Sequence, residues 1–443
     1  MKDLTVGNEA KVIFKFALPM VMGNLLQQLY HVVDSLIVGR FLGKEALAAL
    51  GASAPIFYAL IAFIIGIGSG ATIVISQYYG AKNLHKVKRA IDTIFIFLFV
   101  ASIFITITGI TYSEEIFRLL HVEEAVIPLA TKYFNVFMMG MLAFFGFSAT
   151  SSVLRGLGDS MTPLWFMLIA TVINILLDII FIVVFNWGIE GVAYATVIAQ
   201  AGAFISGAIY LTHKHQLISF NFRKYKFDKE LFYQSVKIGL PTGFQQAFVA
   251  LGIMALVRIV NNFDTDVLAA FSVASRIDAL AAMPALNLAS ALSAFVGQNL
   301  GAKRIDRIKK GLRATLVMAW GISLTVTIGV ILFGDHIMAL FIQDENVIAH
   351  GTKYLVIVSS FYMIFSTMFV MHGVLRGAGD TLIPMFITLF SLWVIRIPFA
   401  IVLSDLFGVT GIWWAIPIGW TMGLVGSLIY YFTGRWKTKS IVT

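Results

Sequence analysis

Twelve long apolar segments divide this chain, and they constrain its fold more than any other feature of the sequence. A helix that crosses the roughly 30 Å hydrocarbon layer of a membrane needs about 20 mostly apolar residues. Open sheets would leave unpaired backbone groups in that layer, so the segments must be helices. Several exceed the minimum length, which predicts tilts or bends. The predicted spans lie near residues 12–38, 47–79, 90–111, 129–153, 163–185, 188–211, 231–260, 268–300, 312–334, 352–374, 384–404 and 410–433.

Composition agrees with an all-α integral membrane protein. Of the 443 residues, 59% are hydrophobic and 12% are charged, whereas soluble domains keep about a quarter of their residues charged. There are no cysteines, which excludes disulfides, thiol catalysis and cysteine-based metal sites. The histidines lie mostly in polar loops without metal-ligand spacing, so we expect no metal site beyond a bound Na⁺, no cofactor and no enzyme.

The net charge of +9 is gathered in short basic clusters between the apolar segments. This pattern suits anionic membrane lipid as a partner and not nucleic acid. The two termini and the even-numbered loops hold 24 of the 32 Lys and Arg residues, and the odd-numbered loops hold six. Because cytoplasmic loops carry the positive excess, we expect a multi-pass protein of the cell (inner) membrane with both termini in the cytoplasm. We also expect a monomer.

The second half of the chain repeats the first in a nearly constant register. Val-Leu-Arg-Gly-Leu-Gly-Asp at 153–159 recurs as Val-Leu-Arg-Gly-Ala-Gly-Asp at 374–380, and Leu-Pro at 18–19 recurs at 240–241. Six spans per half preserve the orientation, which predicts two pseudo-symmetric, parallel six-helix lobes. The predicted division is an N-terminal lobe at 1–213, a cytoplasmic connecting segment at 214–237 and a C-terminal lobe at 238–443.

Several motifs, in this order and at these spacings, resemble the multidrug and toxic compound extrusion (MATE) family over essentially the whole chain. The resemblance implies a V-shaped pair of six-helix lobes that acts as a secondary active antiporter. Such a transporter exchanges external Na⁺ or H⁺ for cationic or amphipathic drugs by alternating access. The motifs are the two Leu-Arg-Gly-x-Gly-Asp turns, Gln77 with Gly80 and Ala81, and the residues Pro19, Gln27, Asp34, Gly39, Arg40, Asn174, Asp178, Arg396 and Pro398.

Two aspartates lie within predicted spans, where an ionised carboxylate is costly unless it is paired, hydrated or protonated. Asp34 lies in the first span, and Asp178 lies in the fifth, one helical turn after Asn174 and on the same helical face. Thr196 follows in the sixth span. Oxygen atoms are the ligands that hard cations prefer, and the resemblance implies that Asp34, Asn174, Asp178 and Thr196 form a cation site. Alternatively, these side chains only make hydrogen bonds between helices or to backbone carbonyls.

The duplication provides an internal comparison for this site. The repeat register places Leu256 opposite Asp34, Phe399 opposite Asp178 and Ile416 opposite Thr196. The scaffold motifs therefore recur in both halves, whereas the oxygen ligands occur in one. The amide and the hydroxyl beside the carboxylates favour Na⁺, since a proton needs neither.

Other residues carry weaker predictions. Arg396 lies inside the eleventh span and needs a carboxylate or carbonyl partner, as a tether or as a substrate contact. Pro19 and Pro241 remove a hydrogen bond each and should bend their helices. Gly66, Gly68 and Gly70 predict a close helix approach. The candidates for lining a substrate cleft are Gln27, Tyr30, Gln245, Gln246, Phe248, Met254 and Met283.

One alternative function stays open. A flippase for lipid-linked oligosaccharides or lipids has a related architecture, but its cleft should present several basic residues to pyrophosphate. Arg396 is the one mid-span cation in this sequence. A nucleotide site for an ATP-driven pump and paired acids with a nucleophile for a membrane enzyme are both missing. A passive channel is harder to separate, although a one-sided cation site favours alternating access.

Overall fold

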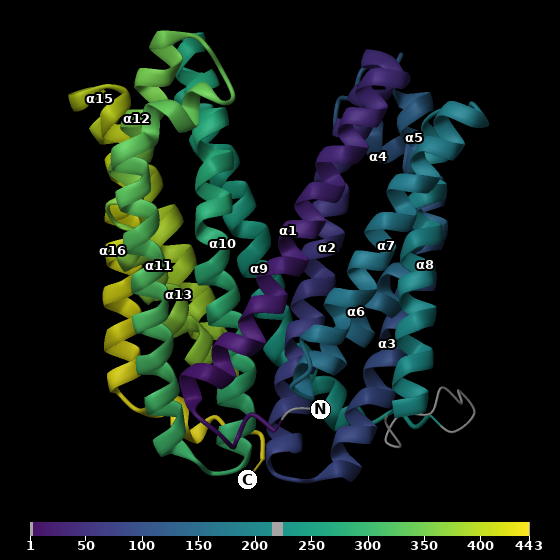
Figure 1. Ribbon diagram of the computed structural model, residues 1–443, viewed down its shortest axis with the longest axis vertical. Helices are drawn as coiled ribbons and strands as arrows, with labels where there is room; N and C mark the ends of the chain where they lie inside the picture. The colour runs from purple at the N-terminus through teal and green to yellow at the C-terminus, as the bar shows by residue number, and fades with distance from the viewer. Residues whose placement is uncertain (1–2, 215–224, 443) are drawn as a thin grey trace. The chain divides into compact units, whose positions relative to one another are not determined.

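The computed structural model describes residues 3–214 and 225–442, and this part of the chain is helical without strands (Figure 1). Ten of its helical segments are long and apolar enough to cross a membrane. These are α1 (Glu9–Phe41), α2 (Gly43–Gly80), α3 (Leu84–Thr111), α7 with η1 (Met161–Val184), α8 (Ile189–Lys214), α9 (Lys229–Val260), α10 (Thr265–Gly301), α11 (Ile305–Ala339), α14 to α15 (Leu382–Phe407) and α16 (Val409–Phe432).

Two further spans are bent pairs of shorter helices. α5 (Ile127–Met139) continues into α6 (Met141–Gly156), and α12 (Glu345–Ser359) continues into α13 (Tyr362–Gly377), each with a bend of 50°. Counting each pair once gives twelve spans, as the sequence predicts. Both breaks fall inside predicted spans, 129–153 and 352–374. The remaining short helices are α4 (Ser113–Leu119) and η4 (Arg435–Thr438).

At each break, the hydroxyl of a threonine from a neighbouring helix donates a hydrogen bond to a backbone carbonyl. Thr106 Oγ1 donates to Met138 O at 2.8 Å, and Thr327 Oγ1 donates to Ser359 O at 2.6 Å. The repeat register that pairs 153–159 with 374–380 also pairs Thr106 with Thr327 and Met138 with Ser359. Helix breaks in a membrane are tolerated where neighbouring side chains satisfy the freed groups. The bend is therefore a repeated feature of the scaffold.

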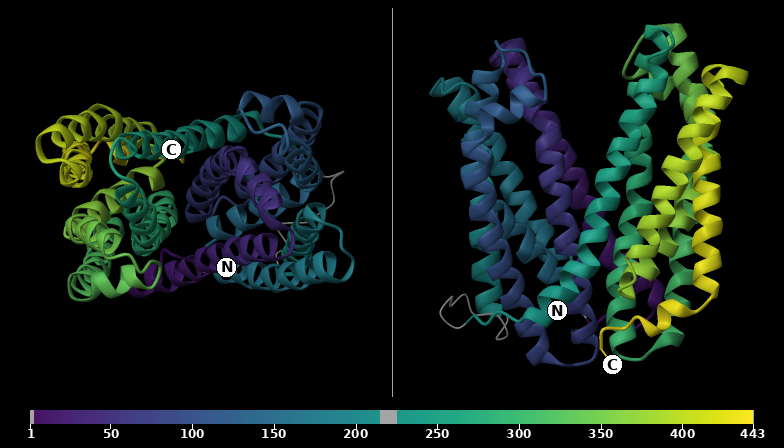
Figure 2. Two further views of the ribbon diagram at one scale, coloured as in Figure 1. Left: turned by 90° about the horizontal axis from the view of Figure 1, so that it is seen from above. Right: turned by 180° about the vertical axis from the view of Figure 1, so that it is seen from behind.

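The described helices form two compact units, whose helices are seen end-on in the left view of Figure 2. Unit 1 contains Leu18–Gly239, and unit 2 contains Asp3–Ala17 together with Leu240–Thr443. The division falls inside α1 and α9, directly before the Leu-Pro pairs that contain Pro19 and Pro241, and both helices continue through these prolines. Of the predicted connecting segment 214–237, residues 215–224 lie outside the described residues and 229–237 belong to α9.

Each unit has its own aromatic core. In unit 2, the buried ring of Trp413 stacks on Phe271 at 5.6 Å and meets Tyr354 edge-on. In unit 1, Phe134 packs against Phe57 and Phe117. Burial of such side chains stabilises each bundle, by about 25 cal/mol for each Å² of apolar surface removed from water.

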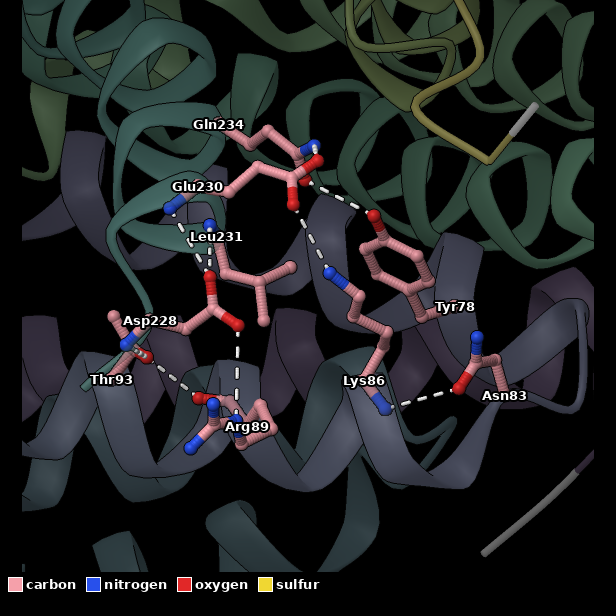
Figure 3. Close-up of polar contacts among 9 residues, drawn as sticks. All are labelled: Tyr78, Asn83, Lys86, Arg89, Thr93, Asp228, Glu230, Leu231 and Gln234. Carbon is pink, nitrogen blue, oxygen red and sulfur yellow. Dashed lines mark hydrogen bonds and ion pairs between the residues drawn. The ribbon is translucent and has the colours of Figure 1, made fainter. Parts of the chain in front are cut away.

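The first turns of α9, residues 229–239, are here called the α9 foot, and they pack within unit 1. A Cβ on Gly70 would lie 2.1 Å from Ser235 O, and one on Gly239 would lie 2.5 Å from Gly66 O. This confirms the close helix approach predicted for the glycines of α2. Figure 3 shows the charged contacts of the α9 foot, where Lys86 Nζ lies 3.1 Å from Glu230 Oε2. Glycine thus lets the two backbones touch at the α9 foot.

The first turns of α1, residues 9–17, are here called the α1 foot, and they belong to unit 2. Arg307 Nη1 lies 3.1 Å from Glu9 Oε1, and Arg307 Nη2 donates to Gly7 O at 2.9 Å. The segment before the foot is held by its backbone, since Leu4 N donates to Gln298 Oε1 and Leu4 O accepts from Asn299 Nδ2. The chain's leading segment is therefore anchored on α10 and α11.

The two ion pairs differ in burial, which generates a prediction for stability. The Arg307 and Glu9 side chains are 9% and 17% exposed, and those of Lys86 and Glu230 are 30% and 64% exposed. We expect Glu9→Gln to cost roughly 2–3 kcal/mol, because it leaves a buried guanidinium without its carboxylate. Glu230→Gln should cost under about 1 kcal/mol, because that pair is solvated. Apparent melting temperatures of the two purified variants in one detergent measure this order, and equal shifts would contradict it.

Candidate cation site in unit 1

Three helices of unit 1 bring the predicted cation ligands together. α1 contributes Asp34, α7 contributes Asn174 and Asp178, and α8 contributes Thr196. Asn174 and Asp178 are 0% exposed, Thr196 is 4% and Asp34 is 6% exposed. Asp34 and Asp178 lie close enough to interact electrostatically. The four residues therefore share one buried position in the bundle.

In the described part of the chain, the candidate ligands from α7, Asn174 and Asp178, have no hydrogen-bond partner for their side chains. Neither the amide nitrogen nor the amide oxygen of Asn174 is bonded, and neither of the two carboxylate oxygens of Asp178 receives a hydrogen bond. Buried polar atoms are otherwise nearly always satisfied, and each exception needs an explanation. The alternative in which Asn174 and Asp178 only bond across helices gains no support from these contacts. The oxygens of both side chains are therefore not engaged by hydrogen-bond donors of the described residues.

Thr196 has two neighbours. Its hydroxyl donates to Val192 O at 3.0 Å, which is the backbone contact of the alternative interpretation. The same oxygen lies 2.8 Å from Tyr30 Oη, and Tyr30 is also within hydrogen-bonding reach of Asp34. Tyr30 thus connects the ligand from α8 to the ligand from α1.

A cavity of about 540 Å³ opens beside these residues, inside unit 1. Asp34 and Thr196 line it, whereas the fully buried Asn174 and Asp178 are not among its lining residues. Of the predicted cleft residues, Gln27 and Tyr30 line this cavity. The other lining residues are His31, Ser35, Leu47, Leu50, Gly51, Ala54, Phe57, Tyr58, Ile61, Tyr133, Phe137, Phe144, Phe147, Met167, Ala170, Thr171, Ala199 and Gln200. The wall is therefore apolar and aromatic, with Asp34 as its carboxylate.

Helix periodicity also predicts His31 as a lining residue, although it was not among the predicted cleft residues. Gln27, Tyr30, His31 and Asp34 follow the spacing of one helical face, and all four line the cavity. His31 meets Tyr30 edge-on at 4.9 Å. The aromatic residues from α5 and α6 carry no comparable signal, because their orientation depends on the bend between those helices.

The electrostatics of the site follow from the proximity of two carboxyl groups. Neither Asp34 nor Asp178 forms an ion pair with a basic side chain among the described residues. Two carboxylates close together at low dielectric repel strongly, so they cannot both stay ionised alone. A shared proton or a bound cation resolves the repulsion. No cluster of three or more His, Cys, Asp or Glu suited to a metal ion occurs in the described ranges.

A π-helix follows the site directly. η1 (Ile180–Val184) begins just after Asp178, whereas a second π-helix, η3 (Phe390–Arg396), lies in the corresponding span of the second half but ends before Phe399, the position opposite Asp178. π-Helical turns are rare and are often found at functional sites. In unit 1 the turn follows the buried acid, and in unit 2 it ends at Arg396.

In unit 2, the carboxylate of Asp278 has hydrogen-bond partners within the protein. Asp278 accepts hydrogen bonds from Tyr362 at 2.5 Å and from Tyr354 at 3.4 Å, and Arg396 is an electrostatic neighbour. Arg396 is expected to have a carboxylate or carbonyl partner, and Asp278 is the carboxylate that interacts with it electrostatically. The described residues contain no ion pair between the two. This acid is satisfied by protein groups, unlike Asp178.

The remaining predicted cleft residues lie in unit 2, outside this cavity. Gln245 Nε2 donates to Thr388 Oγ1 at 2.6 Å, and Phe248 O accepts from Trp393 Nε1. Met254 is exposed, Met283 is buried and Gln246 is half-buried. A role for these five in binding stays a prediction.

The internally duplicated helical fold, with a pair of neighbouring acids without basic partners in one half, defines this chain as a membrane transporter built from repeats. The MatE family model matches the chain twice, at residues 19–180 and 241–402, so each match begins at a Leu-Pro proline. The chain belongs to this family, the multidrug and toxic compound extrusion transporters, which confirms the resemblance seen in the sequence.

Individual relatives support the same assignment. "Probable multidrug resistance protein YpnP" of Bacillus subtilis is 33% identical over 442 residues, covering 100% of this chain and 99% of the relative. "Probable multidrug resistance protein NorM" of Thermotoga maritima is 26% identical and covers 98% and 94%. A solved outward-facing multidrug resistance MATE family transporter of the MOP superfamily has a TM-score of 0.90 at 25% identity, covering 98% of this chain and 97% of that one.

The geometry predicts that Na⁺ binding depends on the acid pair. A ligand that binds the folded protein raises its stability by mass action, so added Na⁺ should raise the apparent melting temperature of the purified protein over a choline control. Asp178→Asn should weaken Na⁺ binding at least about tenfold, which corresponds to ~1.4 kcal/mol. Asp278→Asn is the matched control, because that acid is already satisfied by tyrosines. An unchanged Na⁺ response in Asp178→Asn would contradict the site.

Proposed function

We propose that this chain is a secondary active multidrug efflux antiporter that exchanges external Na⁺, or H⁺, for cationic or amphipathic small molecules by alternating access. One observation carries the proposal. Asp34 and Asp178 are electrostatic neighbours without a basic partner in the described part of the chain, and Asp34 lines a cavity of about 540 Å³. An acid pair of this kind needs a mobile positive charge, and cavity access lets that charge come and go.

The ligand set favours Na⁺ over H⁺ as the coupling ion. A proton shared between the two carboxyl groups would relieve their repulsion without help from other residues. Asn174 would then remain a buried amide without partners, at an energetic cost. A Na⁺ ion instead uses the amide oxygen of Asn174 and the hydroxyl of Thr196 together with both acids, since hard cations prefer oxygen ligands.

The cavity wall suits the proposed substrates. Aromatic side chains such as Phe57, Tyr58 and Phe137 line it, and Lys and Arg do not occur among its described lining residues. Aromatic faces attract cations, and the carboxylate of Asp34 adds to that attraction. Relatives of this chain are named multidrug resistance and multidrug export proteins, which agrees with broad selectivity.

A lipid-linked oligosaccharide or lipid flippase is the alternative function. Phosphate groups are recognised by Arg and Lys, and a wall of aromatic residues with one acid offers them repulsion. The composition of this wall therefore favours export of cations.

The proposed setting is the cell membrane with both termini in the cytoplasm, as a monomer in contact with lipid. Leu4 is held by Gln298 and Asn299, next to the turn after α10, and Tyr430 near the end of α16 bonds to Asp380 in the turn after α13. Both turns belong to the loops in which the positive charge gathers, and this supports cytoplasmic termini.

Transport in proteoliposomes tests the proposal. Efflux of a cationic dye such as ethidium should follow an imposed Na⁺ gradient more strongly than an imposed proton gradient. Asp34→Asn and Asp178→Asn should each abolish gradient-driven transport while the protein remains folded, because the ion loses a carboxylate ligand. Asn174→Ala should impair the Na⁺-driven component selectively. Transport that ignores both gradients, or that survives both Asp substitutions, would refute the proposed coupling.

A further inference from the structure

Two ion pairs outside the cation site occupy equivalent positions in the two halves. The repeat register pairs Glu9 with Glu230 and Lys86 with Arg307. The distance is 3.1 Å in both ion pairs. We name Lys86 with Glu230 the α9 clasp and Arg307 with Glu9 the α1 clasp. Each clasp fixes the first turn of one half's first helix to the helix after the second span of the other half.

The clasps are part of a larger repeated arrangement. On the unit 2 side, Arg304 donates to Thr5 O at 3.0 Å and Arg307 to Gly7 O at 2.9 Å. On the unit 1 side, Asp228 N donates to Thr93 Oγ1 at 3.0 Å and Arg89 lies 3.8 Å from Asp228 (Figure 3). Lys82 and Lys303, at equivalent places in the two turns, share a left-handed φ of 58°. Both feet are therefore held by turns of the same construction.

Chain continuity gives the feet a mechanical role. α1 passes from unit 2 to unit 1 after Ala17, and α9 passes from unit 1 to unit 2 after Gly239. Alternating access requires the arrangement of two such units to change. Each change must therefore either strain these continuous helices or release a foot from its turn.

The two clasps are unequal in a way that decides which foot can be released. Arg307 is buried, and besides Glu9 it bonds to Asn299 Oδ1 at 3.1 Å and to Gly7 O, so that separation would leave an unpaired buried guanidinium. Lys86 is partly exposed and Glu230 is mostly exposed, so water replaces their contact when they part. The α9 foot otherwise meets α2 through Gly66, Gly70 and Gly239, where backbone lies against backbone, and through Gln234 Oε1, which accepts a weak hydrogen bond from Tyr78 Oη at 3.4 Å.

We propose that the α9 clasp opens and re-forms in each transport cycle, whereas the α1 clasp stays closed throughout. This inference rests on the proposed antiport function. It assigns Lys86 and Glu230 to a latch outside the cation site, and it makes the α1 foot a fixed anchor.

The absence of cysteine from the chain provides a clean test. The double variants Lys86→Cys with Glu230→Cys and Glu9→Cys with Arg307→Cys would each be reconstituted and treated with a short, reducible bis-thiosulfonate cross-linker. We expect cross-linking of the first pair to stop ethidium transport and reductant to restore it. Cross-linking of the second pair, to the same yield on gels, should leave transport unchanged.

Several outcomes would overturn the inference. Transport that persists when the first pair is fully cross-linked shows that the α9 clasp need not open. Equal inhibition by both cross-links shows that the α1 foot moves as well. The uncross-linked double variants must transport as the parent does, and Glu230→Gln serves as a second variant that leaves the ion pair open without a cysteine.

Failure of the antiport proposal would be recognised separately. If the parent protein moves no ethidium under any gradient, the function is wrong whatever the clasps do. In that case the cross-linking yields still test the latch, because they need no transport. The yield for the 86–230 pair should change between Na⁺ and choline or on addition of ethidium, and the yield for the 9–307 pair should not. Yields that respond alike, or not at all, count against the latch.

Discussion

Hydrocarbon offers polar groups no hydrogen-bonding partner, and most features of this structure answer that constraint. The backbone is satisfied by helices, and where a span breaks, Thr106 or Thr327 takes the freed carbonyl. Asp278 is satisfied by two tyrosines, and the buried Arg307 by Glu9, Gly7 and Asn299. Several other buried side chains have one polar atom without a hydrogen bond, but Asn174 and Asp178 are the described residues in which both side-chain polar atoms are unbonded. This pair of unbonded polar side chains, one helical turn apart on α7, is the physical basis of the proposed ion site.

Internal duplication separates what the scaffold requires from what the chemistry requires. The threonines at the bends, the left-handed lysines and the ion pairs at the feet all recur in one register. The acids do not recur, since Leu256 and Phe399 stand where Asp34 and Asp178 would be. A feature present in both halves is explained by folding or by motion that involves both. A costly feature present in one half needs a function of its own.

The sequence predicted much of this fold because hydrophobic length and positive charge are strong, additive signals. The twelve spans, the repeat and the family could be recognised, and so could the close approach at the glycines of α2. Three features could not be predicted from the sequence. The first turns of α1 and of α9 each pack within the unit formed mainly by the other half of the chain. This depends on long-range packing, so the boundary between the units at Gly239 could not be predicted from the basic segment after residue 213. The bends at Met139 and Ser359 depend on a hydroxyl from another helix. The lining aromatics of α5 and α6 depend on those bends.

The unequal clasps and the one-sided acid site bear on each other through α1. This helix carries Asp34 in unit 1, and its foot is anchored in unit 2 by the buried Arg307. In the proposed mechanism, an ion that enters or leaves between Asp34 and Asp178 changes the repulsion on α1, and a firmly held foot allows that change to act on the anchored unit. If both feet were released easily, the change in repulsion on α1 would move only that helix and would not act on the anchored unit. With one ion site, the proposed mechanism is served by one fixed foot and one that opens, and the fixed foot belongs to the helix that carries Asp34.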